Sequence, residues 1–273
     1  MENMDNQKVI LSVIVPVTER CDPLKELFLE YKAGIEATGL GYEIIYVLDG
    51  NRPALLEELT HLQESEKLTI ITLAKWFGET TALNAAFSKA SGDILLTLPA
   101  YRQIQADQIP KIVGALDQCD MALARRWPRI DSFFNRLHTR VFNYIMRSFS
   151  GLEIHDAGCG ARAFKRIVIE EIQLYGDLHR FFPVLAHQQG FRVTEINIDQ
   201  SPKEANYRFF SPGLYMRRLL DLLTIFFLIK FTKKPLRFFG LVGGGLGGLG
   251  LIVTLYLVCL LYTSDAADDY FWV

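Results

Sequence analysis

Cysteine is scarce in this 273-residue sequence. The four cysteines lie far apart, at Cys21, Cys119, Cys159 and Cys259. None of them forms the closely spaced pair of a zinc site, and their spacing differs from the disulfide framework of a small secreted domain. We therefore expect reduced thiols in a domain that faces the cytosol.

An excess of basic charge is also missing. Lysine and arginine total 29 against 31 aspartate and glutamate residues, which gives a formal net charge of −2. Nucleic-acid binding requires a basic patch or domain, so this balance excludes nucleic acid from the predicted partners. Charged residues make up 22% of the chain and hydrophobic residues 50%, which excludes a disordered protein and predicts a large core, a membrane segment, or both.

Charge is absent altogether from Phe238 to Val258. This run of roughly 21 residues would form a helix about 32 Å long, which matches a hydrocarbon core about 30 Å thick. We predict a transmembrane helix within residues 235–258. Basic residues precede it, at Lys230, Lys233, Lys234 and Arg237. The positive-inside rule then places the large N-terminal domain, residues 1–213, on the cytoplasmic side of the inner membrane.

The segments on either side of the span are interpreted separately. Within residues 214–234, polar side chains share one helical face among leucine, isoleucine and phenylalanine. This pattern predicts an amphipathic helix in the membrane interface, and a buried helix of the soluble domain is the alternative. Residues 259–273 begin with a string that looks like the translation of a transposase adapter used in DNA library preparation. We expect a read-through scar there, so that the native chain differs after about Val258; a genuine acidic tail is the alternative.

Glycine recurs every four residues in the predicted span, at Gly240, Gly244 and Gly248. Small residues at this spacing let two membrane helices approach closely, which predicts a homo-oligomer. The alternative is that the lipid simply tolerates glycine, and the sequence favours neither interpretation.

Apolar runs and turn signals alternate along the N-terminal domain. Val9–Val15 is a continuous β-branched run, as expected for a strand buried on both faces. Further strands are predicted at Tyr42–Leu48, Leu68–Leu73, Ile94–Leu98 and Met121–Ala124. Helices are predicted after an Asp22 N-cap and a first-turn Pro23, and at Pro53–Ser65, Thr80–Ala90 and Asp107–Asp117.

This alternation predicts an α/β fold with a mostly parallel sheet and helices on both faces. In such sheets a ligand binds outside the carboxyl ends of the strands. We therefore expect the chemistry in the loops that follow Leu48, Leu98 and Ala124.

Several motifs, in order along Val9–Val258, resemble those of the family 2 glycosyltransferases of GT-A fold. They are Val13-Ile-Val-Pro16, Asp49-Gly50, Phe77-Gly78, Ser91-Gly-Asp93, Asp156-Ala-Gly-Cys-Gly-Ala-Arg162 and Gly176-Asp-Leu-His-Arg-Phe181. The most similar branch transfers a sugar from a nucleotide to a polyisoprenyl phosphate. The resemblance implies a GT-A domain followed by interfacial and transmembrane helices. It also implies inverting transfer from a UDP- or GDP-sugar to a polyprenyl phosphate at the cytoplasmic face.

The chain departs from this family at the metal site. The family's Asp-x-Asp motif, which holds Mg²⁺ or Mn²⁺, falls on Pro99-Ala100-Tyr101, so both carboxylates are missing. A diphosphate leaving group still needs positive charge, and arginine can grip phosphate oxygens bidentately. We predict that arginine replaces the metal: Arg102 is the first candidate, and Arg125 and Arg126, at the end of the fifth predicted strand, are the others. The alternative for Arg102 is a solvated loop residue.

The resemblance implies roles for the remaining site residues. Those implied to bind the nucleotide are Asp49, Gly50, Asp93 and Gln103, and Asp156 is implied to orient the acceptor phosphate. Those implied to hold that phosphate are Arg162, Arg180, Lys203 and Arg208. Because a phosphate monoester is already ionised at neutral pH, no strong general base is required. Turn-forming roles are the structural alternatives for the aspartates.

The missing carboxylates leave other functions open. A pseudoenzyme could keep the fold and act as a membrane scaffold or a nucleotide-binding regulator. A glycosyltransferase that uses a soluble sugar acceptor is a third interpretation, which the predicted membrane segments disfavour.

Overall fold

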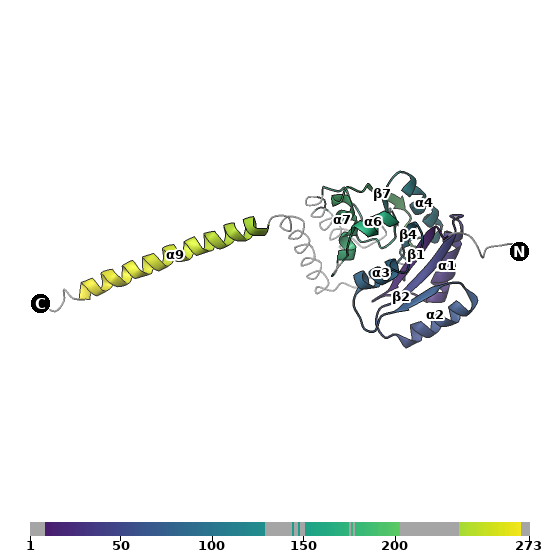
Figure 1. Ribbon diagram of the computed structural model, residues 1–273, viewed down its shortest axis with the longest axis horizontal. Coiled ribbons are helices and arrows are strands. Elements are labelled where there is room, and N and C mark those ends of the chain that lie inside the picture. The colour runs from purple at the N-terminus through teal and green to yellow at the C-terminus, as the bar shows by residue number, and fades with distance from the viewer. Residues whose placement is uncertain are drawn as a thin grey trace. The chain divides into compact units, whose positions relative to one another are not determined.

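The computed structural model describes residues 9–128, 144, 147, 151–174, 176, 178–202 and 235–268 (Figure 1). The predicted interfacial helix at 214–234 lies outside the described residues, as do Lys203 and Arg208. The chain divides into two compact units after Asp221, and each is described by itself.

Seven strands form one sheet in the order β3-β2-β1-β4-β6-β5-β7. Their bounds are β1 Leu11–Val17, β2 Tyr42–Leu48, β3 Thr69–Thr72, β4 Ile94–Thr97, β5 Met121–Arg126, β6 Arg162–Lys165 and β7 Val193–Ile198. Only β6 runs against its neighbours, pairing antiparallel with β4 and β5. The predicted mostly parallel sheet is therefore confirmed, and β6 and β7 complete it beyond the predicted strands.

Helices cover both faces of the sheet. Their bounds are α1 Leu24–Glu36, α2 Pro53–Ser65, α3 Glu79–Phe87, α4 Ile109–Gly114, α6 Arg166–Glu171 and α7 Phe182–Gln188, with 3₁₀ turns η1 Ala106–Gln108, η2 Ala115–Asp117 and η3 Leu178–Phe181. On one face, alternate residues of β1 such as Val13 share a core with Leu27 of α1 and Ile112 of α4. On the other face, the Phe164 ring of β6 lies edge-on to Phe87 and Phe182, at 5.7 and 5.0 Å between ring centroids.

The predicted start of α1 is wrong in one respect. Pro23, not Asp22, is the N-cap residue, and no side chain caps this helix. The Asp22 carboxylate instead accepts a hydrogen bond from the backbone N–H of Arg102 at 2.9 Å, and the Asp22 N–H donates to the Ala100 carbonyl at 2.8 Å. Asp22 thus ties the loop after β1 to the loop after β4, a contact that local sequence does not encode.

The order of the strands creates a switch point between β1 and β4. From β1 the chain continues outward through β2 and β3, and then returns to β4 on the other side of β1. The loops after β1 and β4 therefore leave the sheet in opposite directions and open a crevice where ligands bind in folds of this kind.

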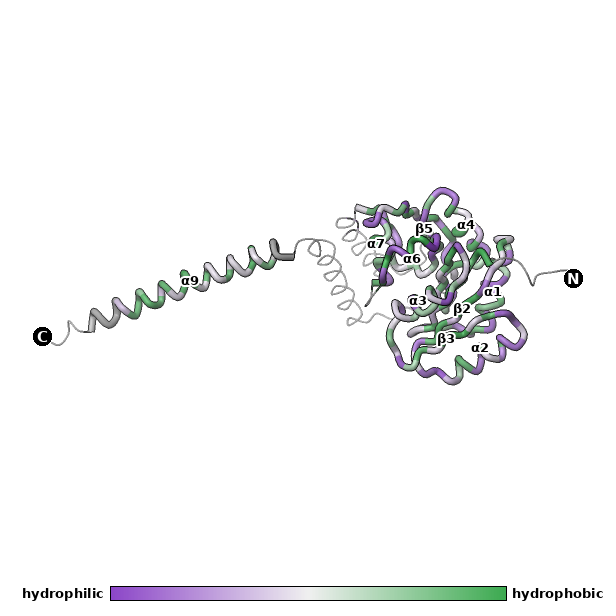
Figure 2. Tube along the Cα trace, in the orientation of Figure 1, coloured by the Kyte–Doolittle hydropathy of each residue, from purple (hydrophilic) through white to green (hydrophobic). Residues whose placement is uncertain are grey.

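The predicted apolar helix is present as α9, Pro235–Asp268. Its stretch Phe239–Tyr262 has 24 residues and a mean hydropathy of 2.1, and none of its most apolar window is buried inside the protein. Figure 2 shows the hydrophobic colouring along this helix. At about 36 Å it is long enough to cross a bilayer. The apolar stretch ends at Tyr262 rather than Val258, because Cys259–Tyr262 adds another helical turn without charge.

Candidate active site at the carboxyl edge of the sheet

Most of the predicted site residues gather at one edge of the sheet. Asp49 follows β2, Gln103 lies in the loop after β4, and Arg125 ends β5. Because β6 is antiparallel, its first residue, Arg162, pairs with Thr97 at the end of β4. The loop that enters β6 therefore brings Asp156 to this same edge.

A buried ion pair joins two of these loops. Arg126 donates from Nε to Asp156 Oδ2 at 2.6 Å and from Nη2 to Oδ1 at 2.7 Å, and both side chains are only 1% exposed. Glu195 of β7 accepts hydrogen bonds from the backbone N–H groups of His155 and Asp156, at 2.6 and 2.9 Å. Asp156 is thus held through both its carboxylate and its backbone.

Arg126, one of the arginines predicted to replace the metal, is buried in this ion pair. Side chains alternate between the faces of a strand, so Arg126 continues the side of β5 that carries the buried Ala122 and Ala124. This parity was the available signal for a buried arginine. Arg125 occupies the opposite side, is half-buried, and lies 5.1 Å from the ring centre of the exposed Trp127.

Asp49 ties β2 to the loop that enters α3. Its two carboxylate oxygens accept hydrogen bonds from the backbone N–H groups of Phe77 and Gly78, both at 2.8 Å, and it is 1% exposed. Gly50 has φ +88°, and a Cβ there would come within 3.3 Å of the Trp76 backbone nitrogen. Asp49 therefore joins two segments that are distant in the sequence, and its nucleotide role stays a prediction.

Backbone contacts hold the segment that replaces Asp-x-Asp. The Tyr31 hydroxyl lies 3.0 Å from the Pro99 carbonyl oxygen and 3.1 Å from that of Tyr101, and donates to this pair. Gln103 is fully buried; its Oε1 accepts from the Gly160 N–H at 2.7 Å and its Nε2 donates to the Tyr101 hydroxyl at 3.2 Å. Gln103 thereby fixes the loop that enters β6.

These residues do not fit a divalent cation. Mg²⁺ and Mn²⁺ prefer carboxylate and other oxygen ligands, which the side chains of Pro99 and Ala100 lack and Tyr101 offers only as a phenol. Across the part of the chain that the structure describes, no group of three His, Cys, Asp or Glu side chains could hold a metal ion.

Arg102 is paired with carboxylates from the start of α1. Its guanidinium lies 3.5 Å from Asp22, 3.0 Å from Glu26 and 2.8 Å from Glu30. The hydrogen bond to Glu30 is the main cause of a raised pKa, and the side chain is only 6% exposed. Arg102 is therefore no solvated loop residue, and its predicted role at a phosphate stays a prediction.

Arg162 binds backbone carbonyls around a small cavity. Its guanidinium donates to the carbonyls of His179 (2.6 Å), Cys159 (3.1 Å) and Ala157 (3.3 Å). Burial lowers the pKa of this guanidinium, and the nearby Glu79 opposes that shift. His179 in turn lies 3.3 Å from Glu79, between Nε2 and Oε2.

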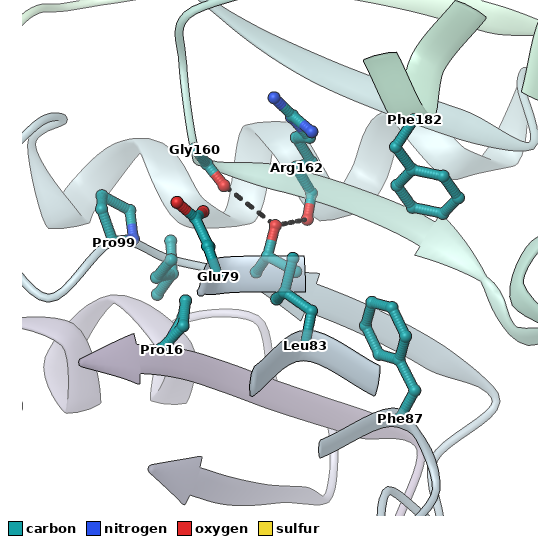
Figure 3. A pocket seen from close by; sticks show the side chains of 10 residues that line it. Pro16, Glu79, Leu83, Phe87, Pro99, Gly160, Arg162 and Phe182 are labelled. Atoms are coloured by element: carbon teal, nitrogen blue, oxygen red, sulfur yellow. Dashed lines mark hydrogen bonds between the residues drawn. The ribbon is translucent and has the colours of Figure 1, made fainter. Parts of the chain in front are cut away.

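The cavity lies at the ends of β1 and β4 (Figure 3). Its volume is about 20 Å³, room for roughly one water molecule. The Thr97 hydroxyl donates to the Gly160 carbonyl at 2.9 Å. Glu79 and Pro99 also line the cavity.

One predicted residue, Asp93, lies apart from these, whereas Arg180 is close to Arg162. Asp93 is exposed and precedes β4, so it lies at the amino edge of the sheet, opposite Asp49. Its backbone carbonyl accepts from the Arg166 N–H at 2.9 Å. Arg180 is half-buried in η3, next to His179.

Comparisons with known proteins identify the family. Residues 12–173 match the model of glycosyl transferase family 2. A dodecaprenyl-phosphate galacturonate synthase of Rhizobium johnstonii is 28% identical over 258 residues, which cover 92% of this chain and 76% of that protein. An undecaprenyl-phosphate 4-deoxy-4-formamido-L-arabinose transferase of Pseudomonas fluorescens is 29% identical over 252 residues, covering 91% and 72%.

Solved structures share the fold at low identity. Glucosyl-3-phosphoglycerate synthase from Mycobacterium tuberculosis, in complex with Mn²⁺, UDP and phosphoglyceric acid, is 11% identical with a TM-score of 0.59 over 78% of each chain. A mannosyltransferase from Pyrobaculum calidifontis, in complex with GDP-Man and Mn²⁺, is 16% identical with a TM-score of 0.55 over 80% of this chain and 62% of that one. With the family model matching most of its length, this chain belongs to glycosyl transferase family 2 and is a glycosyltransferase of GT-A fold.

Proposed function

We propose that this glycosyltransferase moves a sugar from a UDP- or GDP-sugar to a polyprenyl phosphate, with inversion, at the cytoplasmic face of the inner membrane. The observation that supports a lipid acceptor is helix α9: its apolar stretch of 24 residues lies in the same chain as the transferase domain. The names of the relatives support the same acceptor class, since they specify dodecaprenyl and undecaprenyl phosphate. The basic residues before the span support the cytoplasmic face.

The proposed reaction is a single in-line displacement. An acceptor phosphate oxygen, already ionised at neutral pH, attacks the anomeric carbon of the sugar while the bond to the nucleoside diphosphate breaks. No proton has to be removed from this nucleophile, so the buried Asp156 is not required as a base. We assign Asp156 and Arg126 to positioning the loop 156–160.

Two arginines at the carboxyl edge are suited to hold phosphate: Arg125 the leaving diphosphate and Arg180 the acceptor phosphate. Both residues are half-buried. Arg162 directs donors at three backbone carbonyls instead, and we assign it to positioning the loops around His179. Lys203 and Arg208 remain proposed phosphate ligands.

The test is a transfer assay in proteoliposomes with a panel of labelled UDP- and GDP-sugars. With polyprenyl phosphate present, we expect label to move into the organic phase, and Arg125→Ala to reduce that transfer. Arg192→Ala is the matched control, because Arg192 precedes β7 at the amino edge and pairs with Asp120. Label that appears only on a water-soluble glycan would overturn the lipid acceptor.

A second function is favoured by one observation. The cavity at the ends of β1 and β4 holds roughly one water molecule, and the carboxylates of Asp-x-Asp are replaced beside it. These features suit a catalytically impaired scaffold or nucleotide-binding regulator at the membrane. In the same assay, nucleotide binding without turnover of any sugar would favour this second function.

A further inference from the structure

The two tryptophans of residues 1–221, Trp76 and Trp127, both lie on the surface of this unit. They are 57% and 55% exposed, and the neighbouring Phe77 is 48% exposed. Among the described residues of the unit, these three are the exposed tryptophan and phenylalanine side chains. Large aromatic side chains are usually buried in a folded domain, so their exposure indicates a surface that contacts another molecule.

The three side chains lie at the carboxyl edge of the sheet, as the candidate active site does. Trp76 and Phe77 lie in the loop after β3, and Trp127 directly follows β5. We call these three residues the aromatic rim. β3 and β5 are five places apart in the strand order, which is roughly 24 Å at about 4.8 Å between neighbouring strands. An extended surface can contact the whole rim, whereas a single nucleobase cannot.

The backbone that carries the aromatic rim is fixed. In the loop after β3, the buried Asp49 carboxylate accepts hydrogen bonds from the N–H groups of Phe77 and Gly78, both at 2.8 Å. After β5, the Trp127 N–H donates to the Ile198 carbonyl of β7 at 2.9 Å. Because the backbone is already ordered, the exposed rings lose little conformational entropy when they bind.

A cation accompanies the aromatic rim in each loop. The Lys75 ammonium lies 5.1 Å from the centre of the Phe77 ring, and the Arg125 guanidinium carbon lies 5.1 Å from that of Trp127. Residues 73–78 and 125–128 contain no aspartate or glutamate. Aromatic rings beside lysine and arginine are typical of a membrane–water interface, where the rings enter the headgroup region and the cations meet lipid phosphates.

We infer that the aromatic rim docks the transferase domain on the surface of an anionic phospholipid bilayer. This inference rests on the proposed function for the lipid acceptor that the docked domain reaches. Docking brings Arg125, which we assign to the leaving diphosphate, to the level of the lipid phosphates, where the acceptor phosphate also lies. The proposed span in α9 makes docking intramolecular, so a modest affinity of the rim for lipid is enough.

The experiment measures which quenchers reach each tryptophan in full-length protein in nanodiscs that contain anionic lipid. Two single-tryptophan proteins carry Trp272→Phe, one with Trp127→Phe and the other with Trp76→Phe. We expect lipid brominated on its acyl chains to reduce the emission of both. Bromine near the headgroup end should quench most, because an interfacial side chain lies about 5–10 Å deep.

The matched control has its one tryptophan at the amino edge of the sheet. Gln189→Trp, in a protein with all three native tryptophans replaced by phenylalanine, puts it at an exposed position before β7. Brominated lipid should leave its emission unchanged. Lys75→Gln should lower the ratio of docked to undocked domain about fivefold, the effect of one basic residue at an anionic surface. Lys89→Gln, an exposed position before β4, should leave that ratio unchanged.

Three results would overturn the inference: rim tryptophans that lipid does not quench, equal quenching in the Gln189→Trp control, or Trp76 emission that responds to UDP or GDP and not to lipid. These results are separable from failure of the proposed function. Lipid quenching of Trp76 and Trp127, in a protein that transfers no sugar to lipid, keeps the inference and overturns the proposed function. Sugar transfer to polyprenyl phosphate by a protein whose rim lipid does not quench does the reverse.

Discussion

The pair Arg126–Asp156 places two charges where water does not reach. Removing such charges from water costs several kcal/mol each, and two short charge-assisted hydrogen bonds offset that cost. The pair therefore contributes little net stability while both partners are present. Its consequence is rigidity, because neither charge can leave without the other.

Asp156→Ala would leave the Arg126 guanidinium buried and uncompensated. We expect the free energy of unfolding to fall by about 3–5 kcal/mol, measured by denaturant unfolding in detergent. Glu153→Ala is the matched control, because this carboxylate of the same loop is 84% exposed and lies 3.9 Å from Arg147. It should cost at most about 1 kcal/mol. Equal effects of the two substitutions would contradict a buried ion pair.

Tyr42, at the start of β2, makes the stability of the folded domain decrease at alkaline pH. Burial, together with the Glu36 carboxylate, raises the pKa of its phenol from the ordinary value of 10.0 to about 12. A raised pKa means that the folded state favours the neutral phenol. This contribution is complete below pH 10 and is lost as the pH rises through about 12. In urea unfolding, Tyr42→Phe should lose less stability than the parent protein between pH 9 and pH 12; an equal loss would show that Tyr42 is unimportant.

For single residues, the sequence predicts which side chains lie at the site better than it predicts their hydrogen-bond partners. Asp49 could be selected because a strand end and a glycine mark its position, and Gln103 and Asp156 because they match motifs of the family that the sequence resembles. Their partners could not, because they are distant along the chain: Arg126 is 30 residues from Asp156, and Gly160 is 57 from Gln103. Arg102 shows the same limit, since its carboxylate partners on α1 become neighbours only when the sheet forms.

Among the elements, β7 helps to hold the loop before β6. Its Glu195 accepts from two backbone N–H groups of that loop. Glu195→Ala should leave both donors without this acceptor and lower stability by about 1–3 kcal/mol. Hydrogen exchange at His155 and Asp156 should become faster. Glu171→Ala, an exposed position on α6, is the control; unchanged exchange in Glu195→Ala would contradict the role of β7.

Strands that are apolar runs were predictable, and the short strand β6, which carries charged residues, was not. The prediction for β2, Tyr42–Leu48, matches the observed bounds, because this strand is a long apolar run. The four residues of β6 include Arg162 and Lys165, so no apolar periodicity marks them. Their strand is specified by pairing with both β4 and β5, which is a tertiary effect.

The apolar stretch of helix α9 leads to a prediction about insertion into a bilayer. Leu251 lies near the middle of Phe239–Tyr262 and is 62% exposed within the protein. Leu251→Arg should raise the apparent free energy of membrane insertion by about 2.5–3.5 kcal/mol, measured by glycosylation mapping. Tyr262→Arg, at the end of the stretch, should cost much less because its charge can reach the interface. Equal costs would argue against a membrane span.

For the whole molecule, the fold is shared with solved glycosyltransferases, and the difference in sequence lies at the switch point of the sheet. The two solved structures were determined in complex with Mn²⁺ and a nucleotide, whereas Pro99 and Tyr101 of this chain offer no carboxylate to a metal ion. The fold class was predictable because strands and helices alternate along the N-terminal domain. The order of the strands was not, because it depends on pairings between segments that are distant in the sequence.

One measurement tests the central claim most directly: transfer of labelled sugar from a panel of UDP- and GDP-sugars to polyprenyl phosphate, in proteoliposomes that contain EDTA. We predict that label reaches the organic phase at the same rate with and without the chelator. Label that reaches the lipid only after Mn²⁺ is added would contradict the metal-free site. Absence of labelled lipid under every condition would contradict the lipid-directed transferase itself.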